Sequence, residues 1–154
     1  MVVAFFMMLW KTGLLDTYVG IIAVYMTMNV GYVIWMMRGF IHAIPEECEE
    51  AAIVDGCNRF KAFYHVVLPL SGPGISAVAI MTFIFSWNEF LYALILTRSK
   101  VKTAPIAVLS YVSSEGIRWG EMAAAAILIV LPVLILSLVI QKHIISGLTM
   151  GAVK

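Results

Sequence analysis

Residues 46–70 read EECEEAAIVDGCNRFKAFYHVVLPL, and this stretch decides the fold. Four glutamates fall within its first five positions, two alanines follow directly, and a glycine comes four residues after the second alanine. Long apolar runs with almost no formal charge lie on both sides of it. The sequence therefore places an acidic, helix-forming insert between two segments that are apolar enough to enter lipid.

The composition indicates a membrane protein. Of the 154 residues, 62% are hydrophobic and 12% are charged, whereas soluble domains are roughly 45–50% apolar and about 25% charged. The formal net charge of +1 gives no electrostatic reason to expect nucleic acid as a partner. The two cysteines, Cys48 and Cys57, both lie in the insert and lack the C-x-x-C spacing, so we interpret them as small packing residues.

Three apolar runs are long enough to cross a membrane. Residues 17–37 carry no formal charge between Asp16 and Arg38, and at about 1.5 Å per residue they match a hydrocarbon core of about 30 Å. Residues 72–97 form a second run that one acid, Glu89, interrupts. Residues 122–141 form a third, in which Pro132 predicts a kink. We expect all three to be transmembrane helices.

The two ends of the chain are less regular. Residues 1–12 hold ten apolar residues before Lys11, and ten helical residues reach only about half of a bilayer. We interpret this segment as the end of a span that begins upstream. Residues 142–154 follow the last run as a tail. The basic residues divide equally between the two sides of the membrane, so the positive-inside rule assigns no orientation.

The first part of the insert predicts a short helix that docks elsewhere. Pro45 suits a first helical turn, and the glutamates that follow suit the positive end of the helix dipole. Their close spacing also makes them repel one another, and a cationic partner would relieve that repulsion. The opposite side is small and smooth at Ala51 and Ala52, and Gly56 fits the position where a helix ends and the chain reverses.

The second part of the insert predicts another short helix. Asn58 fits its N-cap, and the Leu68-Pro69 pair is expected to end it before residues 71–74 break the chain. Its apolar positions form one stripe that we expect to pack against the bundle: Phe60, Phe63, Tyr64 and Val67. The alternative is an interfacial loop without a partner, but anionic headgroups would repel the acidic face.

The insert resembles a cytoplasmic motif of permease subunits in importers of the ABC class. That motif is E-A-A, three residues, G, nine residues, then I-x-L-P. Here Glu50-Ala51-Ala52 precedes Gly56, and residues 66–69 read VVLP after the correct interval, with Val66 in place of isoleucine. Further stretches are similar to carbohydrate permeases of the maltose-transporter type: residues 12–20, 38–56, 86–97 and 147–154.

The resemblance implies an all-α, multi-span helical bundle of the type I ABC importer permease kind, with a cytoplasmic helix–turn–helix insert over residues 45–69. It implies that residues 38–71 and the C-terminus are cytoplasmic in a multi-pass protein of the cell membrane. The first insert helix would be the coupling helix, with Glu50 facing basic residues of an ATPase subunit and Leu68-Pro69 closing the motif. The implied partners are a second permease subunit, two ATPase subunits and an extracytoplasmic solute-binding protein.

Polar residues inside the runs are candidates for a sugar pathway. Trp87, Asn88 and Glu89 are adjacent in the 72–97 run, and an aromatic face beside an amide and a carboxylate suits a sugar. Glu89 could equally be solvated or ion-paired near the outer interface, since intramembrane charges usually face a cavity or the bundle interior. Asn29 could contact the pathway, or it could serve helix packing.

Other functions find little support in the sequence. It holds no G-x-x-x-x-G-K-[ST] motif, so ATP hydrolysis would belong to a partner, and we expect no cofactor. The spacing of His42, Cys48, Cys57 and His65 fits no common zinc pattern. The alternative function is a membrane anchor or scaffold derived from a truncated permease gene, which would transport nothing.

Overall fold

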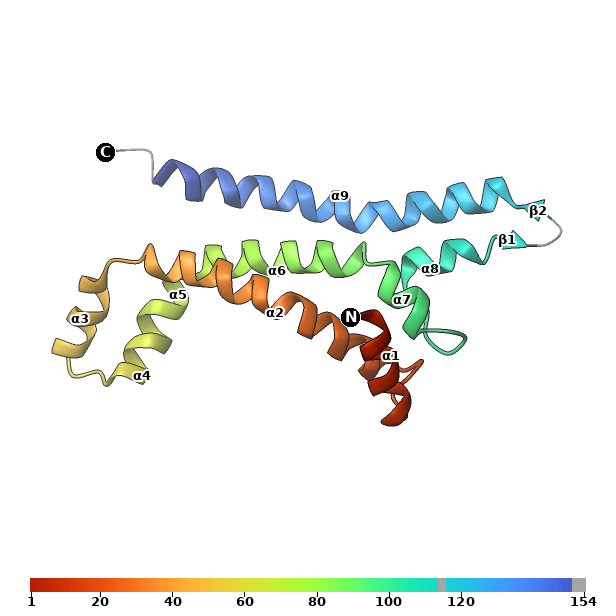
Figure 1. Ribbon diagram of the computed structural model, residues 1–154. Helices are drawn as coiled ribbons and strands as arrows, with labels where there is room; N and C mark the ends of the chain where they lie inside the picture. Colours follow the sequence, from red (N-terminus) through yellow and green to blue (C-terminus); the bar gives the residue numbers. More distant parts are fainter. Residues whose placement is uncertain (114–115, 151–154) are drawn as a thin grey trace. The chain divides into compact units, whose positions relative to one another are not determined.

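The computed structural model describes residues 1–113 and 116–150, and it describes side chains as far as residue 138. The helices outside the insert are α1 (Val2–Lys11), α2 (Tyr18–His42), α6 (Gly72–Trp87), α7 (Leu91–Leu96), α8 (Ala104–Leu109) and α9 (Trp119–Met150). The insert holds α3 (Glu46–Val54), α4 (Arg59–Ala62), the π-helical turn η1 (Phe63–Val67) and α5 (Leu68–Leu70). Figure 1 shows these elements along the chain.

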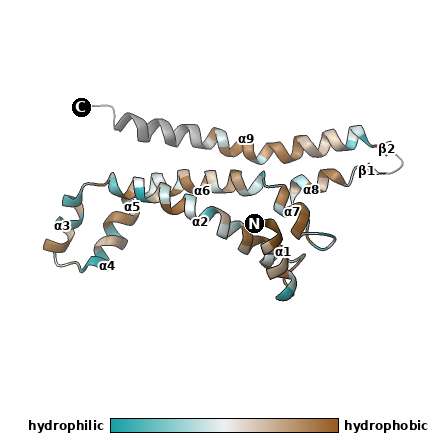
Figure 2. Cartoon of the chain, in the orientation of Figure 1, coloured by the Kyte–Doolittle hydropathy of each residue, from teal (hydrophilic) through white to brown (hydrophobic). Residues whose placement is uncertain are grey.

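Among the described residues, two helices are long and apolar enough to cross a membrane, namely α2 and residues 119–138 of α9. A third candidate is the pair formed by residues 59–70 and α6, which meet at a bend of 67°. None of the most apolar window of α9 is buried within the chain. Figure 2 shows hydrophobic residues along α1, α7 and the described part of α9, and hydrophilic ones at α3.

The chain divides into two compact units. The first comprises residues 1–29 and 83–138, and the second comprises residues 30–82 and 139–154, of which the last four lie outside the described residues. The core of the first unit forms where α1, α2 and α7 meet the loop after α7. Its buried members are Leu9, Ile21, Val24, Ala93, Leu96 and Val101. This cluster fixes α7 beside α1 and the start of α2.

The structure differs from the sequence prediction over residues 72–97. Helix α6 ends at Trp87, residues 88–90 break the helix, and the separate helix α7 follows. The physical reason is the Glu89 carboxylate, which accepts the backbone N–H groups of Tyr92 and Ala93 at 2.8 and 3.1 Å. By satisfying the first donors of α7, Glu89 starts a new helix where a continuous one was expected.

The helical path after α4 also differs from the prediction, because Leu68-Pro69 does not end it. The chain stays helical through η1 and α5 and bends only at Ser71. A proline inside a helix removes one backbone hydrogen bond, but Pro69 lies in the first turn of α5, directly after the widened π turn. There the regular ladder is already interrupted, so the missing N–H costs little.

The last helix is longer than the predicted 122–141 span. Helix α9 contains Pro132 and continues to Met150, so the described part of the predicted 142–154 tail is helical. Residues 151–154 of that tail lie outside the described residues.

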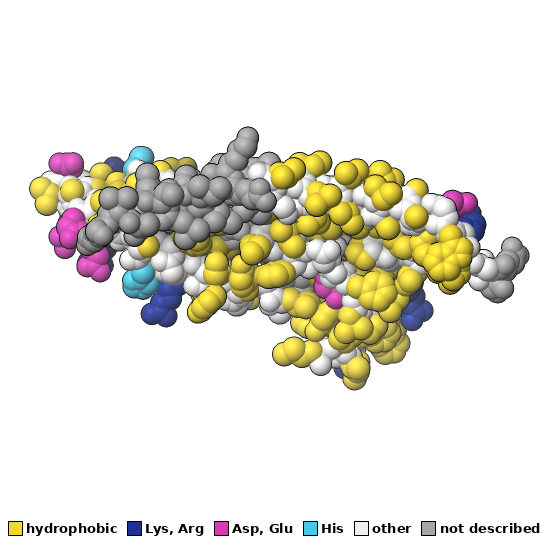
Figure 3. Space-filling view, turned by 90° about the horizontal axis from the view of Figure 1, so that it is seen from above, with side chains coloured by type: hydrophobic (Ala, Val, Ile, Leu, Met, Phe, Trp, Pro, Cys, Tyr) yellow, Lys and Arg dark blue, Asp and Glu magenta, His cyan; other side chains and the backbone are white. Residues whose placement is uncertain are grey.

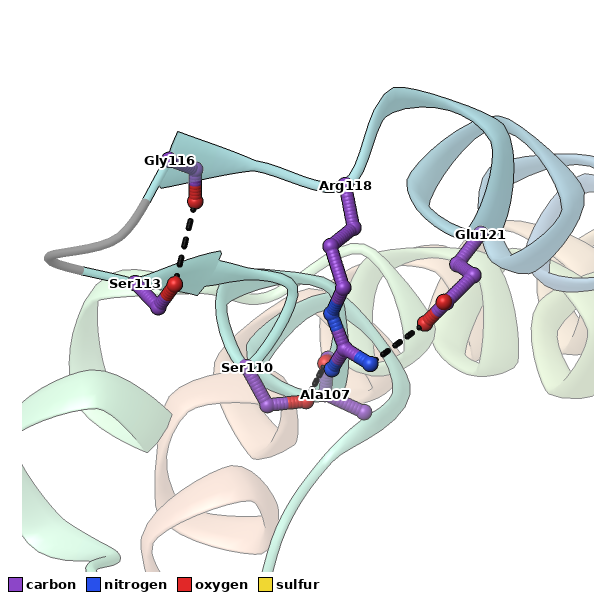
Figure 4. A network of polar contacts seen from close by, with 6 residues as sticks. All are labelled: Ala107, Ser110, Ser113, Gly116, Arg118 and Glu121. Atoms are coloured by element: carbon purple, nitrogen blue, oxygen red, sulfur yellow. Dashed lines mark hydrogen bonds and ion pairs between the residues drawn. The ribbon is translucent and has the colours of Figure 1, made fainter.

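A small hairpin precedes α9. Strand β1 (Val112–Ser113) pairs antiparallel with β2 (Gly116–Ile117). Figure 4 shows the Ser113 hydroxyl donating to the Gly116 carbonyl at 3.1 Å and Arg118 paired with Glu121 at 2.8 Å. The Arg118 guanidinium also lies 5.3 Å from the centre of the Tyr111 ring. These contacts hold the start of α9 to the end of the preceding segment.

Close packing of α2 against α6 in the second unit generates a stability prediction. A Cβ added at Gly74 would lie 2.5 Å from Cγ and 2.7 Å from Cβ of Phe40. We expect Gly74→Ala to displace Phe40 and to lower the free energy of unfolding by about 1–3 kcal/mol, the usual cost of overpacking. The measurement is denaturant unfolding of the purified chain in lipid nanodiscs.

The matched control is Gly31→Ala in α2, where an added Cβ meets nothing within 4 Å beyond its chain neighbours and its own helix. It should be neutral or slightly stabilising, because alanine has the higher helix propensity. Equal destabilisation by the two variants would contradict the close approach of Phe40 to α6.

Candidate functional site

The first candidate site is the surface of α3. Its first turn contains Glu46, Glu47 and Glu49, placed at the helix end where anions are favoured. Among the residues with described side chains, the one ion pair joins Arg118 to Glu121, so it involves no glutamate of α3. Figure 3 shows acidic side chains gathered at the left edge of the view, the end at which Figure 1 draws α3. The helix therefore presents concentrated negative charge to its surroundings.

The motif alanines of α3 face different ways. Glu50 and Ala51 are exposed, whereas Ala52 is buried. Helix α3 lies against α4 and η1, where Ala62 and Val67 are the buried residues. A small residue at position 52 thus serves close packing inside the insert, while Glu50 and Ala51 remain available for contact with another molecule.

The sequence prediction for the aromatic stripe is wrong within this chain. Phe60 is 80% exposed and Tyr64 is 59% exposed, whereas Val67 is buried. The close approach of α3 selects the small side chain of Ala62 for the inward face, and this turns the bulky aromatic rings outward. Of the predicted stripe, only Val67 packs inward.

The turn at Gly56 follows from its backbone conformation. Gly56 has φ +92°, in the left-handed region that a Cβ disfavours. The Gly56 N–H donates to the Ile53 carbonyl, and the Cys57 N–H donates to the Ala52 carbonyl, both at 3.0 Å. These two bonds form the Schellman arrangement that ends a helix on a left-handed glycine. The sequence prediction of a chain reversal at Gly56 is confirmed.

The start of the next helix is capped as the sequence predicts. The Asn58 carboxamide oxygen accepts the Lys61 N–H at 2.8 Å, which satisfies one of the free donors in the first turn of α4. Leu68 and Pro69, which complete the motif, lie in α5. Residues 46–70 thus form a continuous path of two helical arms around the turn at Gly56.

The second candidate site is the break between α6 and α7, where the four predicted pathway residues do not converge. Glu89 is half-buried, and its carboxylate accepts the Tyr25 hydroxyl at 2.9 Å in addition to the two amides of α7. The Asn29 amide donates to the Tyr25 carbonyl at 2.8 Å and to the Ser86 hydroxyl at 3.1 Å. Tyr25 therefore connects Asn29 with Glu89.

The other two predicted residues point elsewhere. The Trp87 indole N–H donates to the Ile129 carbonyl in α9 at 3.0 Å, and its ring stacks on Phe83 at 5.2 Å. The Asn88 amide is exposed and donates to the Ile84 carbonyl of its own helix at 2.9 Å. Trp87 thus joins α6 to α9, while Asn88 closes the end of α6.

Two residues that the sequence patterns did not single out hold this region together. Tyr25 lies one helical turn before Asn29, a spacing that could have marked it. Asp16 lies before α2, and its carboxylate accepts the backbone N–H groups of Arg98, Lys100, Ser99 and Val101. These bonds, from Arg98 first and then Lys100, hold the pKa of the Asp16 carboxyl well below its usual range. No local spacing reveals a contact between residues so far apart in the chain.

Two apolar helices of spanning length in the described part of the chain, with the acidic helix α3 between them in the sequence, are consistent with a helical membrane permease. Residues 1–149 match the family model described as "Binding-protein-dependent transport system inner membrane component". The chain belongs to this family, whose members act as transport components.

Relatives with named substrates are similar over nearly the whole chain. The diacetylchitobiose uptake system permease of Streptomyces coelicolor is 39% identical, covering 100% of this chain and 56% of its own length. The trehalose transport system permease of Mycobacterium tuberculosis is 41% identical, covering 92% of this chain and 53% of its own. The trehalose/maltose permease of Thermococcus litoralis is 34% identical, with 94% and 52% covered. The chain thus spans about half the length of these relatives.

The Tyr25–Glu89 contact generates a prediction about α7. Tyr25→Phe removes one donor from a charged, half-buried acceptor, and hydrogen bonds to charged groups contribute about 1.5–3 kcal/mol. We expect the free energy of unfolding to fall by roughly that amount and amide exchange in residues 91–96 to become faster.

The control is Tyr18→Phe, at the exposed first residue of α2. This variant also removes a tyrosine hydroxyl from α2, and it should change neither the free energy of unfolding nor the amide exchange of residues 91–96. If Tyr25→Phe behaves like Tyr18→Phe, the hydroxyl does not hold Glu89 in place.

Proposed function

We propose that this chain is part of the permease subunit of an ATP-driven sugar importer, working by alternating access with a separate ATPase subunit. The observation that carries the proposal is α3, an acidic helix with an exposed Glu50–Ala51 surface and a left-handed glycine turn, set between candidate spans. The names of the relatives, which specify diacetylchitobiose, trehalose and maltose, support a sugar as the substrate class. They favour a permease over the alternative of an anchor or scaffold.

The proposed topology places residues 38–71 and the C-terminus in the cytoplasm. Residues 17–37, 72–97 and 122–141 would then be spans of one permease domain, and residues 1–12 would end a further span. Because α6 ends at Trp87, the second of these spans is a broken one, with α7 at its outer end. This orientation brings α3 to the side of the membrane where ATP is available.

The proposed coupling element is α3 with its turn. Glu50 would pair with basic residues of the ATPase subunit, and the small side chain of Ala51 would allow that subunit to approach closely. Ala52 packs α3 onto α4 and η1, so a push on α3 would reach α5 and Pro69 through contacts within the insert. The insert would then move as a rigid body when the ATPase subunits close, which is a known way to bias a two-state transporter.

The proposed sugar pathway passes the break between α6 and α7. Asn88 is exposed there, and it is the best placed of the four predicted residues to meet a hydroxyl group. Asn29 and Glu89 would line the pathway indirectly by holding Tyr25, and Trp87 would keep α6 against α9. A second permease subunit would supply the other wall, and a solute-binding protein outside the membrane would deliver the sugar.

The proposed topology is tested by cysteine accessibility. In intact cells, a membrane-impermeant maleimide should leave native Cys48 and Cys57 unlabelled, because both would lie in the cytoplasm. A Ser99→Cys variant in a background of Cys48→Ser and Cys57→Ser should be labelled from outside.

Permeabilised cells are the control, since there all three cysteines should react. Labelling of Cys48 or Cys57 in intact cells would reverse the proposed orientation.

The coupling role is tested at Gly56. A β-branched residue at positive φ costs about 1–2 kcal/mol or more, so Gly56→Val should deform the turn and misplace α3. We expect sugar uptake and substrate-stimulated ATP hydrolysis to fall together, while the amount of chain in the membrane stays unchanged, because insertion depends on the spans. The measurement uses a host that supplies the remaining subunits and any upstream spans.

The matched control is Gly56→Asn, because asparagine tolerates the left-handed conformation that this turn requires. It should retain most of the activity that Gly56→Val loses. Normal uptake and hydrolysis in the valine variant would remove the insert from the coupling mechanism.

A further inference from the structure

Asp16 makes an unusual set of contacts with a loop more than eighty positions away. Its Oδ1 accepts the N–H groups of Arg98 at 2.8 Å and Val101 at 3.1 Å. Its Oδ2 accepts those of Ser99 at 3.1 Å and Lys100 at 3.0 Å. Successive backbone N–H groups that point to one place form an anion-binding concavity, and here the anion is a side chain of the same chain.

The backbone at Asp16 is shaped for this contact. Asp16 has φ 57°, the one positive φ among non-glycine residues in the described part of the chain. Aspartate and asparagine tolerate this left-handed conformation better than other side chains. Its own N–H donates to the Leu96 carbonyl at 3.1 Å. Asp16 therefore bonds both the last residue of α7 and the loop that follows it.

The contact closes over a buried cluster. Leu96, Thr97 and Val101 are each at most 5% exposed, and Leu96 and Val101 pack where α1 and the start of α2 meet α7. At the other end of α7, Glu89 caps the helix and bonds Tyr25 of α2. The start of α7 is thus attached to Tyr25 of α2, and its end is attached to Asp16 before α2. A three-residue break separates α7 from α6.

We propose that Asp16 is a positioning residue for transport: by holding the amides of residues 98–101, it makes α7 move with α1 and the start of α2 rather than with α6. The inference rests on the proposed import function for its consequence and on the contacts of Asp16 for its geometry. Movement of α1 and the start of α2 would then carry α7 along, and the break at residues 88–90 would absorb the difference from α6.

The geometry is tested by amide hydrogen exchange of the purified chain in lipid nanodiscs. Asp16→Asn keeps the shape and the tolerated backbone conformation, but it replaces one acceptor oxygen by an NH₂ donor. Because each oxygen serves a separate pair of amides, exchange should accelerate by about tenfold or more in one pair only. That pair is either Arg98 with Val101 or Ser99 with Lys100.

Two further variants test the same contact, one by removing both carboxylate oxygens and one by keeping both. Asp16→Gly permits the same φ but removes both oxygens, so all four amides should exchange faster. Asp16→Glu keeps both oxygens and should restore part of the protection. Glu121→Gln, which removes a carboxylate from the exposed first turn of α9, is the control and should leave residues 98–101 unchanged.

The functional role is tested by sugar uptake in a host that supplies the other subunits, normalised to the amount of chain in the membrane. Maximal uptake by Asp16→Asn should fall about threefold to tenfold, within the range expected when a coupling contact is lost. The sugar concentration for half-maximal uptake should not change, and Asp16→Glu should recover part of the rate. A purely structural role would lower the amount of chain and leave the normalised rate unchanged.

Unchanged exchange in Asp16→Asn and Asp16→Gly would overturn the holding role, whatever the uptake. Faster exchange with normal uptake in both would overturn the positioning role. If the unmodified chain with all its partners imports no sugar, the proposed function fails and the transport role with it, while the exchange pattern still decides whether Asp16 holds the loop.

Discussion

A chain that enters lipid must satisfy its backbone N–H and C=O groups internally, so a break in the apolar 72–97 run needs other acceptors for the N–H groups that it frees. Where α6 ends, Glu89 accepts the first amides of α7. Where α7 ends, Asp16 accepts four amides of the following loop. Two carboxylates thus replace the hydrogen bonds that a continuous helix would have made.

Local residue type and spacing explain which features the sequence could predict. The turn at Gly56 and the cap at Asn58 depend on residue type at fixed spacing, and both are found as predicted. The apolar runs indicate helices, and two of the helices found reach spanning length without the bent pair. The motif around Glu50 indicates the family through residue type and spacing alone, and the family match over residues 1–149 confirms it.

The errors have a common origin in contacts between distant segments. The sequence predicts one helix over the 72–97 run because Glu89 is interpreted as a single charged residue within it. Glu89 instead caps α7 and accepts a hydrogen bond from Tyr25, sixty-four positions away. The stripe of Phe60 and Tyr64 has the correct period, but the neighbouring α3 determines which face turns inward. Asp16 marks only the boundary of a span in the sequence, because its partners at residues 98–101 are invisible to local spacing.

The π turn η1 has a consequence for how the insert can vary. A π turn accommodates one residue more than the α-helix around it, and each residue turns a helix by about 100°. Phe60, before the turn, and Leu70, after it, therefore stand in a different rotational register from the one a regular helix would give. Removal of a single residue between Phe63 and Val67 would restore regular winding with Phe60 and Leu70 in nearly the same relative register, whereas regular winding over the present length would turn α3 and its acidic face by about 100° about the axis of α4. The π turn therefore lets this segment hold one residue more than a regular helix would without turning the acidic face away.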